Sequence, residues 1–174
     1  AIAQNLLHLT IDGVDDVFFS ILLHLGTLFA VFVAYWADIK EMVVEFFCGI
    51  RDIARHQTPT PVPPARRLIL MIVVGTLPLF VVLPIQDFVE SLNSNTYFIG
   101  AALLVTGVLL FTCDRVRKGK KTAKTATMLD ALLVGVGQAI ATVPGISRSG
   151  MTICAGCFRG FERKFAVRFA FLLS

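Results

Sequence analysis

The residues best placed to do chemistry form the segment 144–150, Pro-Gly-Ile-Ser-Arg-Ser-Gly. Its arginine, Arg148, stands between two serines, and the neighbouring segments 131–143 and 151–158 hold no charged residue. An arginine among apolar residues is costly unless an anion or a fixed partner compensates its charge. We therefore expect this polar loop to be the site of function.

The local chemistry of the loop favours an anion. Pro144 and Gly145 are expected to end an incoming helix, since proline disfavours helical geometry in the residue before it. Ser147 or Ser149 can then cap an outgoing helix, whose first N–H groups carry partial positive charge. With the guanidinium of Arg148, these donors make a cradle for a phosphate or carboxylate. The alternative is that Arg148 pairs with a glutamate on another helix and is purely architectural.

Other chemistries are not supported by the residue pattern. The loop lacks the fifth-position glycine of a nucleophile elbow, and no histidine follows His56, so no downstream triad base is present. Cys154 and Cys157 have redox or metal spacing, but no second cysteine pair or histidine lies nearby. We expect the four cysteines to be apolar packing residues without disulfides.

The composition indicates a membrane protein. Of 174 residues, 56% are hydrophobic and only 16% are charged, with a mean hydropathy of +0.77. Soluble domains usually carry about 25% charged residues. The net charge of +4 comes from short basic clusters between long apolar runs. Membrane topology explains these clusters better than nucleic-acid binding, so no nucleic-acid partner is expected.

Three membrane spans are predicted, at about 17–37, 68–85 and 97–113. The segments 38–67 and 114–128 that follow the first and third spans are rich in lysine and arginine, which places them in the cytoplasm. The expected fold class is therefore an all-α, polytopic membrane protein.

The region 129–158 differs from these spans. Its first half, 129–143, would make only about 22 Å of helix, and its second half, 151–158, is shorter still. Basic residues flank both ends. The pattern predicts a re-entrant helix-loop-helix with its polar tip at membrane depth, where irregular backbone must be buried or line a wet cavity. The alternative is one long span kinked at Pro144.

The two ends of the chain lie in apolar segments. The first residue is not methionine, and 165–174 reads as the start of a further span. We expect 1–174 to be an interior piece of a single integral membrane domain.

The polar loop closely resembles the second signature motif of bacterial undecaprenyl-diphosphate phosphatases, including Gln138 before it and Thr152 after it. Three further segments are similar to segments of the same family: 24–28, 75–78, and 169–173, where Ala170 replaces a serine. The resemblance implies an all-helical inverted repeat in which two re-entrant hairpins meet at a polar active site.

The resemblance also implies an activity. Undecaprenyl diphosphate would be hydrolysed to the monophosphate carrier lipid of cell-wall synthesis, in the bacterial plasma membrane, with a role in bacitracin resistance. The implied catalytic residues are Arg148, which grips the diphosphate, and Ser147 and Ser149, which donate to its oxygens. The implied substrate-binding residues are Gly145, Gly150, Thr152 and Gln138. Membrane lipid is a further expected partner, and a homodimer is an option that the sequence leaves open.

One part of the implied site is missing from this chain. The family's first motif, with its glutamates, serine pair and histidine, would lie upstream of Ala1. A divalent cation, Mg or Ca, would take its ligands there, so no metal ligand is assigned within 1–174, and this piece alone is expected to be inactive. Two other functions stay open: a membrane transporter, and a lipid-diphosphate-binding protein without catalysis.

Overall fold

The computed structural model describes residues 13–55, 62–86, 89, 96–116 and 119–173. These residues form helices, with no strand among them, and one isolated β-bridge joins Lys121 to Phe161. The expected all-α class is confirmed. The helices are α2 (Gly13–Ala34), α3 (Trp36–Ala54), α4 (Pro64–Val82), η1 (Leu83–Ile85), α6 (Thr96–Arg115), α7 (Met128–Ile140), α8 (Arg148–Phe158) and α9 (Arg163–Leu173).

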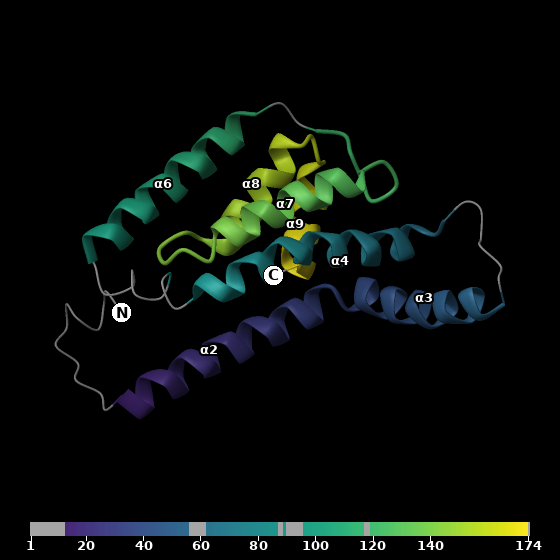
Figure 1. Ribbon diagram of the computed structural model, residues 1–174, viewed down its shortest axis with the longest axis horizontal. Helices are drawn as coiled ribbons and strands as arrows, with labels where there is room; N and C mark the ends of the chain where they lie inside the picture. Colours follow the sequence, from purple (N-terminus) through teal and green to yellow (C-terminus); the bar gives the residue numbers. More distant parts are fainter. Residues whose placement is uncertain (1–12, 56–61, 87–88, 90–95, 117–118, 174) are drawn as a thin grey trace. The chain divides into compact units, whose positions relative to one another are not determined.

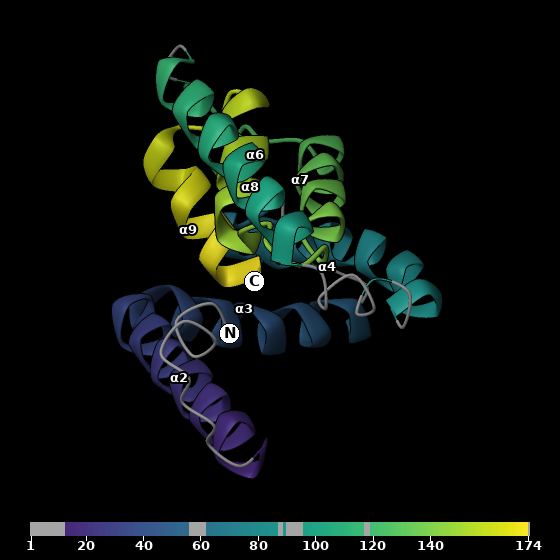
Figure 2. The ribbon, with the colours of Figure 1, turned by 90° about the vertical axis from the view of Figure 1, so that its left-hand side faces the viewer.

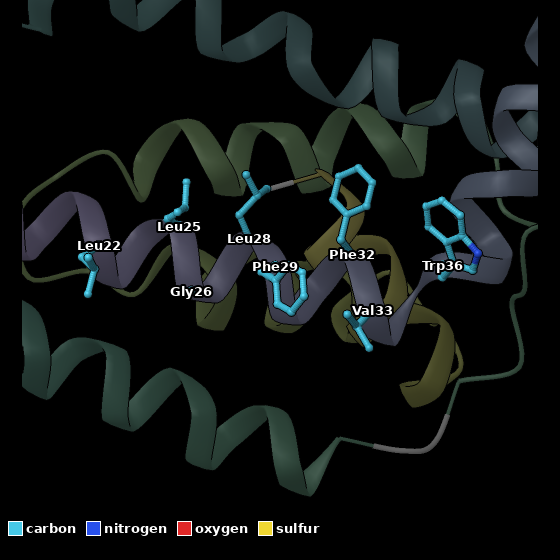
Figure 3. A pocket seen from close by; sticks show the side chains of 8 residues that line it. All are labelled: Leu22, Leu25, Gly26, Leu28, Phe29, Phe32, Val33 and Trp36. Carbon is cyan, nitrogen blue, oxygen red and sulfur yellow. The ribbon is translucent and has the colours of Figure 1, made fainter.

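The chain divides into two compact units, Ala1–Ile39 and Lys40–Ser174. In the first unit, the side chains of α2 from Ile21 onward are almost all exposed. Figure 3 shows the shallow concavity that they form, lined by Leu22, Leu25, Gly26, Leu28, Phe29, Phe32, Val33 and Trp36. Apart from the glycine, every lining residue is a large aliphatic or aromatic one, which suits contact with lipid chains and offers no group for catalysis.

Two of the described helices are long and apolar enough to cross a membrane, with candidate spans at Pro64–Val82 and Tyr97–Arg115. A third candidate arises only if the helices on either side of Tyr35 are counted together as one broken span. Helix α7 is apolar but shorter, at 13 residues. The long helices overlap the ranges 17–37, 68–85 and 97–113 expected from the sequence.

The second unit is built around α7 and α8. Helix α7 packs on α4 and α8, and α8 also contacts α6 and α9 (Figures 1 and 2). The α4–α7 crossing is very close, because a Cβ atom added to Gly135 would lie 2.0 Å from the carbonyl oxygen of Gly75. Small residues at such crossings let helix backbones approach directly in membrane proteins.

The core of this unit takes buried residues from α4, α6, α7, α8 and α9. Phe161, Phe165 and Phe169 stack along one side of it, with ring centroids 4.9 to 6.0 Å apart. Leu68 and Met71 of α4 are buried in the same cluster. The expected further span at 165–174 corresponds to α9, which begins two residues earlier, at Arg163.

Candidate functional site

The segment 129–158 folds back on itself. Beyond its two ends, the amide of Lys121 donates to the carbonyl of Gly160 at 3.0 Å, and the amide of Glu162 donates to the carbonyl of Lys121 at 2.9 Å. These bonds bring the residues before α7 beside those after α8. A single long span would hold its ends far apart, whereas the described residues of this segment fold back as a helix-loop-helix. The re-entrant placement of this hairpin in the membrane stays a prediction.

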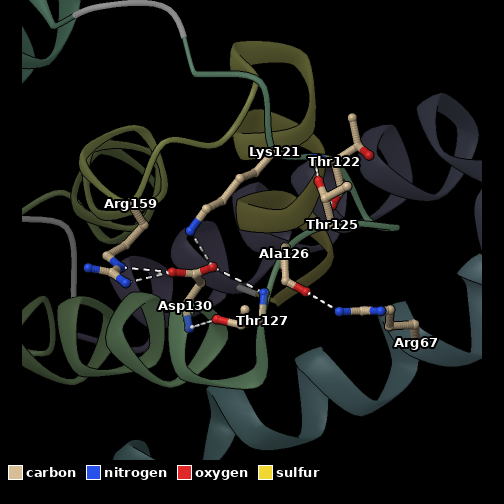
Figure 4. Close-up of polar contacts among 8 residues, drawn as sticks. All are labelled: Arg67, Lys121, Thr122, Thr125, Ala126, Thr127, Asp130 and Arg159. Atoms are coloured by element: carbon tan, nitrogen blue, oxygen red, sulfur yellow. Dashed lines mark hydrogen bonds and ion pairs between the residues drawn. The ribbon is translucent and has the colours of Figure 1, made fainter.

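A buried carboxylate, Asp130, closes this end of the hairpin (Figure 4). Its side chain is fully buried and accepts hydrogen bonds from Lys121 Nζ at 2.7 Å and Arg159 Nε at 2.9 Å. Thr127 caps α7 and completes a capping box, because its hydroxyl accepts from the Asp130 amide while its own amide donates to the carboxylate. Burial alone would raise the pKa of Asp130, but the hydrogen bonds from Lys121, Thr127 and Arg159 lower it well below its usual range.

Sequence reasoning missed Asp130 as a structural residue. The signal was present, because a threonine followed three residues later by an acidic residue before an apolar run is a capping-box pattern. Figure 4 also shows that Arg67 ties α4 to the same end of the hairpin, with its guanidinium donating to the carbonyl of Ala126 at 2.6 Å.

At the opposite end, the turn between α7 and α8 delivers Arg148. The chain makes two short turns, in which Val143 donates to Ile140 at 3.2 Å and Ile146 donates to Val143 at 3.1 Å. Ser147 is the N-cap of α8, and its hydroxyl accepts from the amide of Gly150 at 3.2 Å. Of the two serines proposed as a cap, Ser147 takes that position. Residues 148–150 therefore form the first turn of a helix rather than part of the loop.

The turn rests on α6. The amide of Ser147 donates to the hydroxyl of Thr106 at 3.4 Å, and Thr106 is buried. Gly145 has a φ of 90°, and a Cβ atom there would lie 2.8 Å from the carbonyl oxygen of Ile99. Only glycine combines this left-handed conformation with such a close approach. The structural reason for Gly145 is thus its packing on α6.

Arg148 lines a cavity of about 200 Å³. Apolar residues at the end of α4 and in η1 form one wall, and Thr142, Gln86 and Arg148 supply the polar groups; the lining is Leu79, Val82, Leu83, Gln86, Val89, Thr142 and Arg148. Thr142 and Gln86 were not singled out from the sequence, because neither belongs to a motif and only the fold brings them beside Arg148.

The Arg148 side chain is exposed and makes no ion pair with the described residues. The architectural alternative requires a glutamate partner, and none is found in that part of the chain. Asp87 and Glu90 are acidic residues outside the described residues. Among the described residues, no carboxylate pairs with the guanidinium of Arg148.

The other predicted site residues lie around Arg148 rather than in the cavity lining. Ser147 and Ser149 are half-buried in the first turn of α8. Gly150 is buried, and a Cβ atom there would lie 3.1 Å from the Ser147 hydroxyl. Thr152 is buried, and its hydroxyl donates to the carbonyls of Arg148 and Ser149, both at 3.0 Å. Through these contacts Thr152 stabilises the first turn of α8.

Gln138 lies in the last turn of α7 and is buried. Its Nε2 donates to the carbonyl of Leu173, at the end of α9, at 3.4 Å. Its Oε1 accepts no hydrogen bond from the described residues. This buried amide links α7 to α9, and direct contact with substrate stays a prediction for both Gln138 and Thr152.

The described residues contain no group of three or more His, Cys, Asp or Glu side chains that could hold a metal ion. The residues present in this part of the chain therefore do not fit a divalent-cation site by themselves. Cys113, Cys154 and Cys157 are free thiols buried in the apolar core, as expected for packing residues.

The site can bind an anion. The first N–H groups of a helix have no partner within the helix, and they carry partial positive charge. At α8 this end coincides with the Arg148 guanidinium and with the hydroxyl of Ser147, which accepts from Gly150 and keeps its own proton for donation. Such an arrangement supplies forked and single donors to phosphate oxygens.

Comparison with known proteins gives consistent matches. The family described as Bacitracin resistance protein BacA matches residues 1–174. A relative from Alkaliphilus metalliredigens, named undecaprenyl-diphosphatase, is 41% identical over 175 residues, covering 100% of this chain and 63% of that relative. Relatives with the same name from Methanosphaera stadtmanae and Methanobrevibacter smithii are 37% and 36% identical, covering 90% and 99% of this chain and 58% and 62% of their own lengths. The chain thus spans less than two thirds of the relatives it matches.

Proposed function

Because the chain belongs to the family described as Bacitracin resistance protein BacA, we propose that the full-length protein hydrolyses undecaprenyl diphosphate. The reaction breaks the P–O–P bond, and water supplies the oxygen that yields undecaprenyl phosphate and inorganic phosphate. The observation that carries the proposal is Arg148, an exposed guanidinium in the first turn of α8 that has no carboxylate partner among the described residues and lines a cavity. Its geometry suits a diphosphate.

In this proposal, Arg148 binds the oxygens of the terminal phosphate, where negative charge must be held as the P–O–P bond breaks. Ser147 and Ser149 donate hydroxyl protons from the same turn. The apolar wall formed by Leu79, Val82 and Leu83 leaves the neighbouring surface suited to the first carbons of a prenyl chain. A volume of about 200 Å³ holds the head group, while the rest of the lipid extends into the membrane.

The proposal places the protein in the plasma membrane as a multi-pass protein, with the basic ends of its helices in the cytoplasm. A divalent cation belongs to the proposal as well, with ligands among residues outside this chain. Within the chain, the buried residues Gln138 and Thr152 act through the backbone that they support, Thr152 on the first turn of α8 and Gln138 on the α7–α9 contact.

The experiment is phosphate release from undecaprenyl diphosphate by the purified full-length protein. Arg148→Ala should lower kcat/KM about a hundredfold or more, as loss of one main charge-stabilising donor does. Arg148→Lys keeps the charge but loses the planar fork, so it should recover only part of the activity. The matched control is Arg115→Ala, which removes another exposed arginine, one stacked over Phe111.

The outcomes separate the candidate functions. Equal rates for the wild-type protein and Arg148→Ala would refute the assignment of the site. Tight binding of the lipid diphosphate with no release of phosphate would favour the non-catalytic binding protein. Movement of the lipid across vesicles without hydrolysis would favour the transporter.

A further inference from the structure

A second cavity lies at the other end of the hairpin from Arg148. It has a volume of about 490 Å³ and is bounded by the loop before α7, the start of α4 and the first turns of α9. Its apolar lining includes Pro64, Ala123 and Phe165, and its cationic lining consists of Lys124, Lys164 and Arg168. The length of helix α7, about 20 Å, separates this end of the hairpin from the Arg148 end. The two cavities are therefore distinct sites.

The cationic groups around this cavity fall into two classes. Lys121 and Arg159 pair with Asp130 at 2.7 and 2.8 Å, and Arg163 pairs with Asp114 at 2.7 Å. These three side chains hold the fold together. By contrast, Lys124 and Lys164 have no carboxylate within ion-pair distance among the described residues.

The lining carries a net positive charge. Glu162 is its one acidic residue, against three basic residues, and it makes no ion pair with any described residue. Arg168 is half-buried and makes an interaction of its own, so the two exposed lysines are the charges that we assign to a ligand. Both lysines line the same cavity, so both belong to the surroundings of an anion bound there.

The position of the cavity along α4 indicates that this anion is a lipid head group. Pro64, in the cavity wall, is also the first residue of the candidate membrane span Pro64–Val82. A membrane crossed by this candidate span would therefore have its lipid head groups at the level of the cavity. Lysine side chains at this level extend toward the interface, and basic pockets between membrane helices bind anionic head groups.

We propose that this cavity binds the phosphate-bearing head group of an anionic phospholipid in the leaflet on the basic side of the protein. Lys124 and Lys164 contact the head-group phosphate, and the surfaces of Pro64, Ala123 and Phe165 contact the glycerol and the first methylene groups. The bound lipid bridges the loop before α7 and the start of α9, which are the two ends of the hairpin. The site is independent of the hydrolysis proposed for Arg148.

The test is lipid binding by the purified full-length protein in neutral detergent, with phosphatidylglycerol titrated and the bound lipid counted by native mass spectrometry. Each lysine removed near an anionic head group should weaken binding about fivefold, so Lys124→Gln with Lys164→Gln should weaken it about 25-fold. The matched control is Lys40→Gln with Lys120→Gln, which removes the same charge from two exposed lysines outside the cavity.

The phosphatidylglycerol affinity of the control should stay within about twofold of the wild type, and phosphatidylcholine should bind weakly to all proteins. An equal loss in the control would overturn the proposal, since it would show general charge attraction. Displacement of the lipid by inorganic phosphate at comparable concentration would also overturn it, because the site would then serve a free anion. Phosphate release from the prenyl substrate should be unchanged in the double variant, so this test and that of Arg148 can fail separately.

Discussion

Replacing Gly135 by alanine tests whether direct contact between the α4 and α7 backbones holds the site together. The added Cβ atom would lie 2.0 Å from the carbonyl oxygen of Gly75, which is about 1.4 Å short of ordinary contact at 3.4 Å. The obstacle is backbone rather than a side chain that could rotate away. The two helices must therefore separate, and the cavity between the end of α4 and the turn after α7 must change shape.

The magnitude follows from two opposing effects. Forcing an extra methyl into a well-packed interface costs about 1–3 kcal/mol, and this contact is closer than real Cβ atoms adopt, so we expect the upper part of that range. Alanine also favours a helix over glycine by about 1 kcal/mol. The net expectation is a loss of about 2 kcal/mol in the free energy of unfolding, together with a lower rate of the proposed hydrolysis in the full-length protein.

The assay is reversible unfolding of the full-length protein in mixed micelles, followed by circular dichroism. The control is Gly107→Ala on α6, where an added Cβ atom meets nothing within 4 Å. The control should be neutral or slightly stabilising. If Gly135→Ala unfolded at the same denaturant concentration as Gly107→Ala, the close crossing of α4 and α7 would be refuted.

Two further predictions concern the ends of the hairpin. Thr106→Val removes the acceptor of the Ser147 amide and should lower the free energy of unfolding by about 1 kcal/mol. The control is Thr112→Val, which should leave that free energy unchanged because the exposed Thr112 hydroxyl bonds only within α6. Equal losses of stability in the two variants would refute the contact between Ser147 and Thr106. Asp130→Asn should cost about 3 kcal/mol at neutral pH, at the low end for a buried ion pair because its partners are over a third exposed. The pKa of Asp130 is lowered on folding, so its stabilisation is complete above pH 3.8 and is lost as the pH falls below that value. The asparagine variant should therefore lose less stability on acidification, and parallel acid unfolding curves would contradict this.

Much of the architecture follows from local rules. Apolar run length and basic clusters predicted the all-α class and the hairpin over 129–158, because a membrane limits helix length and basic residues stay on one side. The cap of α8 was also predicted to within two serines, since Pro144 must end one helix and a hydroxyl must begin the next.

The contacts that position the site were not predictable in the same way. The bond from Ser147 to Thr106 joins residues 41 apart in the chain, and nothing local to either residue indicates the other. The same holds for Thr142 and Gln86, which reach the cavity only because α4 and α7 cross at Gly75 and Gly135. Sequence patterns specify elements, whereas the cavity is a property of their crossing.

The joined ends of the hairpin have a consequence for how the protein enters its membrane. Because Lys121 and Phe161 lie side by side, neither basic end would have to be carried across the bilayer if 129–158 inserts as the predicted re-entrant hairpin. Helix α7, at 13 residues, is too short to enter as an independent span, and its turn has backbone groups that lipid cannot satisfy. We therefore expect ordered insertion, in which α4 and α6 enter the membrane first. The hairpin then packs between them from the side on which the chain is synthesised.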